Sequence, residues 1–135
     1  MVIIIIHIFR AAPAPTVDPY AEDMKNRKIM ALECIDRVKI DKKIIEMAMQ
    51  YPTKLPNDIK YKEFLTCSYK KQKFQSADGK MLYDNIYDFL TRFYNRSDLK
   101  TLDICKNVTA SNDGEMAFNS LECIMTQLYE FEEKI

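Results

Sequence analysis

The sequence predicts an all-α protein, and three observations support that fold class. The 135 residues include only two glycines and five prolines, so the residues that punctuate sheets and hairpins are scarce. Met, Leu, Ile, Lys and Glu, which favour helices, are abundant. Apolar residues recur at spacings of three and four along the chain, which places them on one face of a helix. A chain of this length forms one domain and buries roughly two thirds of its unfolded surface without needing cross-links.

Three helices are predicted in the first half of the domain. The first spans Tyr20 to Val38, and the second begins at Asp41, whose side chain can cap it, and ends before Pro52. The third follows the turn at Pro56-Asn57-Asp58. The residues expected to face inward are Ala31, Cys34, Ile35 and Val38 in the first helix, Ile44, Met47, Ala48 and Tyr51 in the second, and Tyr61, Phe64 and Leu65 in the third.

Three more helices are predicted after a turn at Ser76-Ala77-Asp78-Gly79, where Asp and Gly tolerate a left-handed backbone. The fourth spans Met81 to Tyr94, the fifth follows Ser97, and the sixth begins at Asn112, which forms a capping-box pattern with the glutamate three residues later. The inward residues are Leu82, Ile86, Phe89, Leu90 and Phe93 in the fourth, Leu99, Leu102 and Cys105 in the fifth, and Phe118, Leu121, Met125 and Leu128 in the sixth.

The N-terminus resembles a shortened signal peptide, and we assign residues 1–14 to it and residues 15–135 to the helical domain. An apolar run from Val2 to Phe9 precedes the small residues around Ala14, and it is too short to span a bilayer. A truncated gene product and an Ile-rich strand are the alternatives. Secretion is also supported by the glycosylation patterns at Asn95 and Asn107, although helix-end residues explain these equally well.

Composition excludes several function classes. Basic and acidic residues both number 20, so the chain lacks the basic surface of a nucleic-acid-binding protein and no nucleic-acid partner is expected. The only histidine, His7, lies in the segment assigned to the signal peptide, and no glycine-rich phosphate loop is present. We therefore expect no enzymatic activity and no cofactor. The four cysteines are 33, 38 and 18 positions apart, without the close pairs of a zinc site, so no metal is expected.

The cysteines leave two interpretations open on spacing alone, which are two disulfides in a secreted protein or four reduced thiols in a cytosolic one. Spacing favours the disulfides, but four cysteines allow three pairings and the residues do not choose among them.

Six predicted helices, with cysteines in the first, third, fifth and sixth, resemble the insect odorant-binding proteins. The similarity is to the four-cysteine, or minus-C, subgroup, which lacks the second and fifth of the family's six cysteines. Counting back four positions from Cys67 reaches Glu63, and counting back nine from Cys123 reaches Gly114, which are the family's offsets for the two missing cysteines. The run that begins at Gly114 resembles the family's cysteine-Glu-x-Ala-Phe sequence with glycine in place of cysteine. The resemblance covers the chain from Tyr20 to the C-terminus.

The resemblance implies disulfides between Cys34 and Cys67 and between Cys105 and Cys123. It also implies a secreted, extracellular carrier that encloses an odorant, a pheromone or another apolar molecule between its helices, with a membrane receptor or protein as a further partner. Apolar, Met and aromatic side chains could line such a cavity, and ordinary core packing is the alternative for each. The candidates are Met30, Met47, Met49, Tyr69, Phe74, Ile86, Phe89, Leu90, Phe93, Phe118, Leu121 and Met125. The hydroxyls of Tyr69, Tyr83, Tyr87 and Tyr94 could meet a ligand oxygen.

Two other functions remain as alternatives. One is a secreted helical protein with a filled core that binds a protein partner, and the other is an intracellular adaptor with reduced cysteines. The missing third bridge also predicts a looser junction between the third and sixth helices, with faster amide exchange near Glu63 and Gly114.

Overall fold

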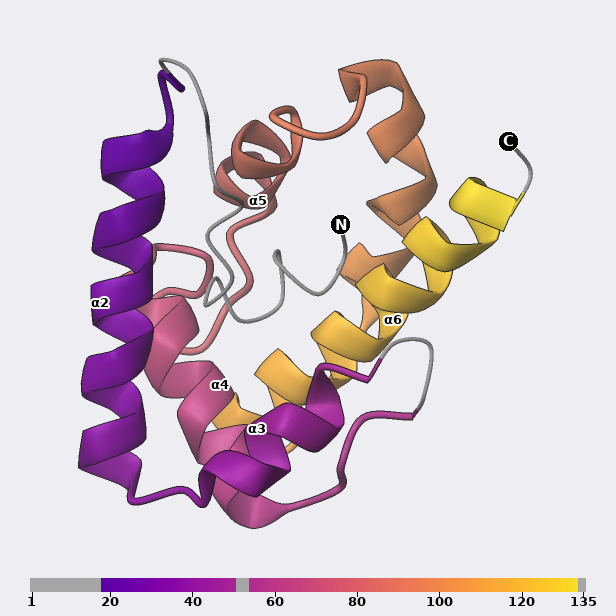
Figure 1. Ribbon diagram of the computed structural model, residues 1–135. Helices are drawn as coiled ribbons and strands as arrows, with labels where there is room; N and C mark the ends of the chain where they lie inside the picture. Colours follow the sequence, from indigo (N-terminus) through magenta and orange to yellow (C-terminus); the bar gives the residue numbers. More distant parts are fainter. Residues whose placement is uncertain (1–17, 51–53, 134–135) are drawn as a thin grey trace.

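The computed structural model describes residues 18–50 and 54–133, and its described part is all-α, as predicted (Figure 1). The helices are α2 (Ala21–Val38), α3 (Lys42–Ala48), α4 (Ile59–Lys71), α5 (Tyr83–Leu90), the 3-10 helix η1 (Arg96–Asn107) and α6 (Asp113–Glu133). The proposed signal peptide, together with Tyr51 and Pro52, lies outside the described residues. None of the described helices combines the length and apolarity that crossing a membrane requires.

Helix α4 is the centre of the arrangement. It packs against α2 on one side and against α6 on the other, while η1 joins α6 to α5 (Figure 1). The inward residues predicted for α4 are almost completely buried, with 0% of Tyr61, 1% of Phe64 and 0% of Leu65 exposed. Because α4 has neighbours on two flanks, its side chains form the core that the other helices share.

Polar side chains begin three of the helices, and the sequence predicted two of these caps, Asp41 and Asn112. Asp41 accepts a hydrogen bond from the backbone N–H of Lys43 at 2.9 Å, and Asp58 accepts one from that of Tyr61 at 2.9 Å. Asn112 accepts from the N–H of Glu115 at 2.9 Å. Each bond satisfies a backbone donor that the first turn of a helix leaves without a partner.

The fifth predicted helix is present but is a 3-10 helix. Its inward residues Leu99, Leu102 and Cys105 are three positions apart, and at most 1% of each is exposed. A 3-10 helix has three residues per turn, so a strict spacing of three keeps all of them on one face. The spacing therefore carried information about the helix type as well as about the buried face.

Two other helices are shorter than predicted, and one buries a different face. α5 begins at Tyr83 rather than at Met81, because Met81 forms an isolated antiparallel bridge with Gln75, and it ends at Leu90, before turns that extend to Tyr94. α3 ends at Ala48, and it buries Ile45 with Ala48 while 55% of Met47 is exposed. The predicted inward position of Met47 is wrong, because Ile45 and Met47 flank Ala48 on opposite sides of this short helix and the buried face includes Ile45.

Both disulfides join the pairs that the resemblance implied. Cys34 of α2 is bonded to Cys67 of α4, and Cys105 of η1 is bonded to Cys123 of α6. All four cysteines are thereby paired. The two bridges fix α2 to α4 and η1 to α6, which leaves the α4–α6 junction to non-covalent contacts.

Candidate ligand-binding cavity

An apolar cavity of about 40 Å³ lies between α4, α5, α6 and the segment that connects α4 to α5. Its lining side chains are Tyr69, Phe74, Met81, Ile86, Phe89, Leu90, Leu121 and Ile124. Six of these eight are among the twelve residues predicted from the sequence, namely Tyr69, Phe74, Ile86, Phe89, Leu90 and Leu121. Four separate segments of the chain therefore contribute to one apolar cavity.

The other six predicted residues do not line this cavity. Phe118 and Met125 are buried in the core, Met30, Met49 and Phe93 are half-buried, and Met47 is exposed. Phe118 belongs to the α4–α6 junction, where its ring centroid lies 6.2 Å from that of Tyr61 in an edge-to-face arrangement. Burial on a helix face alone did not distinguish core packing from the lining of a cavity.

Two lining residues, Met81 and Ile124, were not among the candidates. Ile124 could have been found, because it lies three positions after Leu121 and so shares its face of the sixth helix. Met81 had no such signal, because its inward position depends on the bridge to Gln75 rather than on helical spacing.

Aromatic rings form one wall of the cavity. The ring centroid of Phe74 lies 5.3 Å from that of Phe89 and 6.1 Å from that of Tyr69, in edge-to-face arrangements. Such geometry brings the positive edge of one ring against the negative face of the next. The wall is therefore held by ring contacts as well as by burial.

Two arginines cover the wall formed by Phe74 and Phe89. The guanidinium carbon of Arg27 lies 4.8 Å from the Phe74 centroid and 4.9 Å from that of Phe89, and that of Arg92 lies 4.8 Å from Phe89. Both arginines bind Asp23 of α2, at 2.8 and 2.6 Å. Partial burial raises the pKa of Asp23, but hydrogen bonds from Arg27 and Arg92 outweigh this, so the pKa is lowered overall. The cluster links α2 to the cavity wall.

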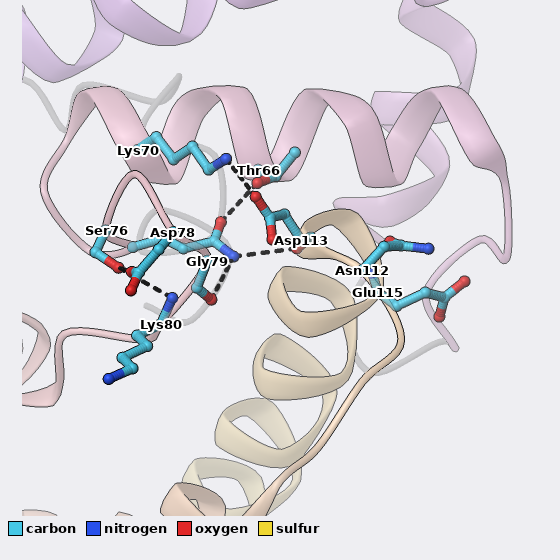
Figure 2. Close-up of polar contacts among 10 residues, drawn as sticks. Thr66, Lys70, Ser76, Asp78, Gly79, Lys80, Asn112, Asp113 and Glu115 are labelled. Atoms are coloured by element: carbon cyan, nitrogen blue, oxygen red, sulfur yellow. Dashed lines mark hydrogen bonds and ion pairs between the residues drawn. The ribbon is translucent and has the colours of Figure 1, made fainter.

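A polar network fixes the turn between α4 and α5 (Figure 2). Gln75, of which only 1% is exposed, donates hydrogen bonds to the carbonyl oxygens of Gly79 at 3.0 Å and Asp113 at 3.1 Å. The Thr66 hydroxyl donates to the Gln75 side-chain oxygen at 2.7 Å, and Lys70 of α4 pairs with the Asp113 carboxylate at 2.5 Å. The network therefore connects α4, the turn and the beginning of α6.

The turn itself holds two lining residues in place. Gly79 has a φ of +95°, and its N–H bonds to the carbonyl of Ser76 at 3.0 Å, as expected for the predicted turn. Across the turn, the N–H of Leu82 donates to the carbonyl of Phe74 at 2.8 Å. Phe74 and Met81 thus enter the cavity from the two sides of one closed turn.

The α4–α6 junction, where the third bridge is absent, contains a polar contact. The side chains of Lys62 and Glu115 form an ion pair of 2.7 Å. A Cβ atom at Gly114 would lie 3.4 Å from the Cβ of Lys62, so the two backbones approach closely. Glu115, the second member of the predicted capping box, therefore bonds across the junction. The predicted speed of amide exchange here remains a prediction.

These features define a small, disulfide-bonded, all-α protein with an apolar cavity among its helices. The model of the PBP/GOBP family matches residues 18–127, and the chain belongs to that family, the insect odorant- and pheromone-binding proteins. Its four cysteines fit the minus-C subgroup. Members of the family are secreted, soluble binding proteins for small hydrophobic ligands and are not enzymes. Neither the curated proteins nor the solved structures gave a significant match.

Proposed function

We propose that the protein is a secreted carrier that holds a small hydrophobic ligand, such as an odorant, a pheromone or a lipid-like molecule, in the cavity between α4, α5 and α6. The observation that carries the proposal is the lining, in which seven of eight side chains are hydrocarbon or thioether groups. An apolar ligand gains free energy by leaving water for such surroundings, at roughly 25 cal/mol per Å² of buried surface. Membership of the PBP/GOBP family supports the same reading.

The cavity must enlarge before it can hold a ligand of that class. Its volume of about 40 Å³ is close to the space of one water molecule, whereas small-molecule pockets commonly have about 300 Å³ or more. The wall best suited to move is the turn that carries Phe74 and Met81, because it is not part of a helix. Flexible Met81 can also change rotamer at low cost.

The small volume is also the observation that favours a second candidate function. A secreted helical protein with a filled core would bind a protein partner through its surface and would take up no apolar ligand. The two functions therefore differ in one measurable property, which is saturable binding of a small apolar molecule.

Titration with the fluorescent apolar probe N-phenylnaphthylamine tests the proposal, with two variants that make the same chemical change. Ile124→Phe adds a ring to the cavity lining, whereas Ile59→Phe adds it at a position that is 74% exposed. We expect saturable binding by the wild type and by Ile59→Phe. We expect affinity at least about 10-fold weaker for Ile124→Phe, because an overfilled site excludes the probe.

Circular dichroism and thermal unfolding show whether the variants keep their fold. A wild-type protein without saturable probe binding would contradict the carrier function and support the filled-core alternative. Equal affinity of Ile124→Phe and the wild type would show that the probe binds outside this cavity.

A further inference from the structure

Among the described residues that line the cavity, Tyr69 is the one whose side chain carries a hydroxyl, amide or charged group. Only 6% of Tyr69 is exposed, and among the described residues its hydroxyl has no hydrogen-bond partner. Buried polar groups are nearly always hydrogen-bonded, because leaving one unpaired sacrifices its hydration without compensation. An unpaired hydroxyl on a residue that lines a cavity therefore calls for a partner, and the cavity is the space in which a ligand could supply one.

The other tyrosines considered as ligand contacts differ from Tyr69 in this respect. Their hydroxyls donate to protein oxygens, Tyr83 to the Cys105 carbonyl at 3.0 Å, Tyr87 to the Asp103 carboxylate at 2.6 Å and Tyr94 to the Glu132 carboxylate at 2.6 Å. Tyr69 is thus the member of this set that has a hydroxyl available to a ligand.

A water molecule is a poor partner for Tyr69. A buried water needs about two to four hydrogen bonds, and the other seven side chains that line the cavity within the described part of the chain carry no hydroxyl, amide or charge. A ligand with one oxygen on an apolar body suits the site better, because the site offers one hydroxyl and is otherwise apolar. Its oxygen can bond to Tyr69 while its carbon atoms contact Phe74, Leu121 and the remaining apolar wall.

The chemistry of the site also restricts the charge of the ligand. Burial raises the pKa of the Tyr69 hydroxyl far above neutrality, so the group is a neutral O–H. The lining residues in residues 18–50 and 54–133 include no cation, and Arg27 and Arg92 already bind Asp23. A carboxylate would lose its hydration without gaining a charged partner.

We infer that Tyr69 selects neutral, oxygen-containing ligands, such as alcohols, aldehydes, ketones or esters, over hydrocarbons of the same shape. The inference rests on the proposed carrier function and adds the ligand's polar group and the residue that recognises it.

Acetophenone and isopropenylbenzene form a suitable test pair, because they differ only in a carbonyl oxygen against a methylene group. Their affinities are measured by displacement of N-phenylnaphthylamine from the wild type, Tyr69→Phe and Tyr87→Phe. The readout is the ratio of the two affinities within each protein. Comparing this ratio between the wild type and a variant cancels the different hydrophobicity of the two compounds. Loss of one neutral hydrogen bond should lower the ratio for acetophenone about 5- to 10-fold in Tyr69→Phe. Tyr87→Phe should keep the wild-type ratio.

The outcomes separate this inference from the proposed function. If the wild type binds neither the probe nor the two compounds, the carrier function fails. If both compounds bind but Tyr69→Phe keeps the wild-type ratio, the carrier function stands and the role of Tyr69 is overturned. Urea unfolding gives a second check, since removing an unpaired hydroxyl should not lower stability. A clear loss of stability would show that the hydroxyl already has a structural partner, contrary to the inference.

Discussion

Replacing each of the two glycines by alanine should change the free energy of unfolding in opposite directions. Gly79 lies in the turn that carries the cavity wall, and Gly114 lies in the first turn of α6. Each substitution adds the same methyl group, and each reduces the conformational freedom of the unfolded chain by the same amount. The difference between the two variants therefore reports on the folded structure alone.

Alanine at position 79 should be destabilising. The φ of +95° is unfavourable for any residue with a Cβ, at about 1–2 kcal/mol. The new methyl group would lie 2.9 Å from the carboxyl carbon of Asp113 and would push that side chain away from Lys70. The partly exposed ion pair is worth up to about 1 kcal/mol, and the loss of unfolded-state freedom offsets about 0.4–1 kcal/mol. The net loss is about 1–2 kcal/mol.

Alanine at position 114 should be neutral to stabilising. Gly114 does not have a positive φ, and its added Cβ would meet the Cβ and carbonyl oxygen of Lys62 at 3.4 Å, which is the limit of ordinary contact. Replacing glycine by alanine in a helix gains roughly 0.5–1 kcal/mol. Small adjustments by Lys62 reduce this gain, so about 0.5 kcal/mol is expected.

Urea unfolding with both disulfides intact measures these effects, with circular dichroism as the readout. We expect the two variants to differ by about 2 kcal/mol with similar m-values. The double variant Gly79→Ala/Asp113→Ala separates the collision from the backbone strain, because the carboxylate is then gone. If Gly79→Ala is as stable as the wild type, the positive φ and the contact with Asp113 do not describe the turn in solution.

Two further predictions concern the charged groups around the core. The pKa of Asp23 is lowered by its bonds to Arg27 and Arg92, so its contribution to stability should be complete at neutral pH and disappear as the pH falls below about 4. Urea unfolding of the wild type and of Asp23→Asn across that pH range measures this contribution. A stability difference that stays constant down to pH 3 would contradict the prediction. Lys62→Met should lower the unfolding free energy by about 0.5–1 kcal/mol and accelerate amide exchange at the beginning of α6, because it breaks the half-buried pair with Glu115. Unchanged exchange by NMR would show that this pair does not hold the junction.

The helices could be predicted because their signals are local. Caps such as Asp41 and Asn112 act within three residues, and a buried stripe such as Leu99 to Cys105 repeats within one element. The buried face of a short helix is harder to predict, because a short helix contains few local signals. In α3, Ile45 and Met47 flank Ala48 on opposite sides, so only the tertiary neighbours of the helix decide that Ile45 is buried and Met47 is exposed.

The cavity could be predicted only in part, because it depends on contacts between segments far apart in sequence. Helical spacing identified Ile86, Phe89 and Leu90 as inward, but it assigned Phe118 to the same set. Nothing local distinguishes a residue that meets another side chain from one that meets a void. The hydrogen-bond acceptor of each tyrosine hydroxyl likewise depends on the tertiary structure. The sequence alone therefore could not show that Tyr69 differs from the other tyrosines.

The α4–α6 junction connects the missing bridge to the size of the cavity. In this chain the junction is held by apolar packing, such as Phe118 against Tyr61. Where the third bridge is absent, two ion pairs, Lys62 with Glu115 and Lys70 with Asp113, and the bonds of Gln75 add to this packing. Partly exposed pairs of this kind contribute up to about 1 kcal/mol each, whereas a disulfide contributes about 3–4 kcal/mol. Opening this junction is therefore less costly than opening a bridged one. Since the turn beside Asp113 carries Phe74 and Met81, we expect the cavity to enlarge on this side when a ligand enters, and amide protection of the turn to change on ligand binding.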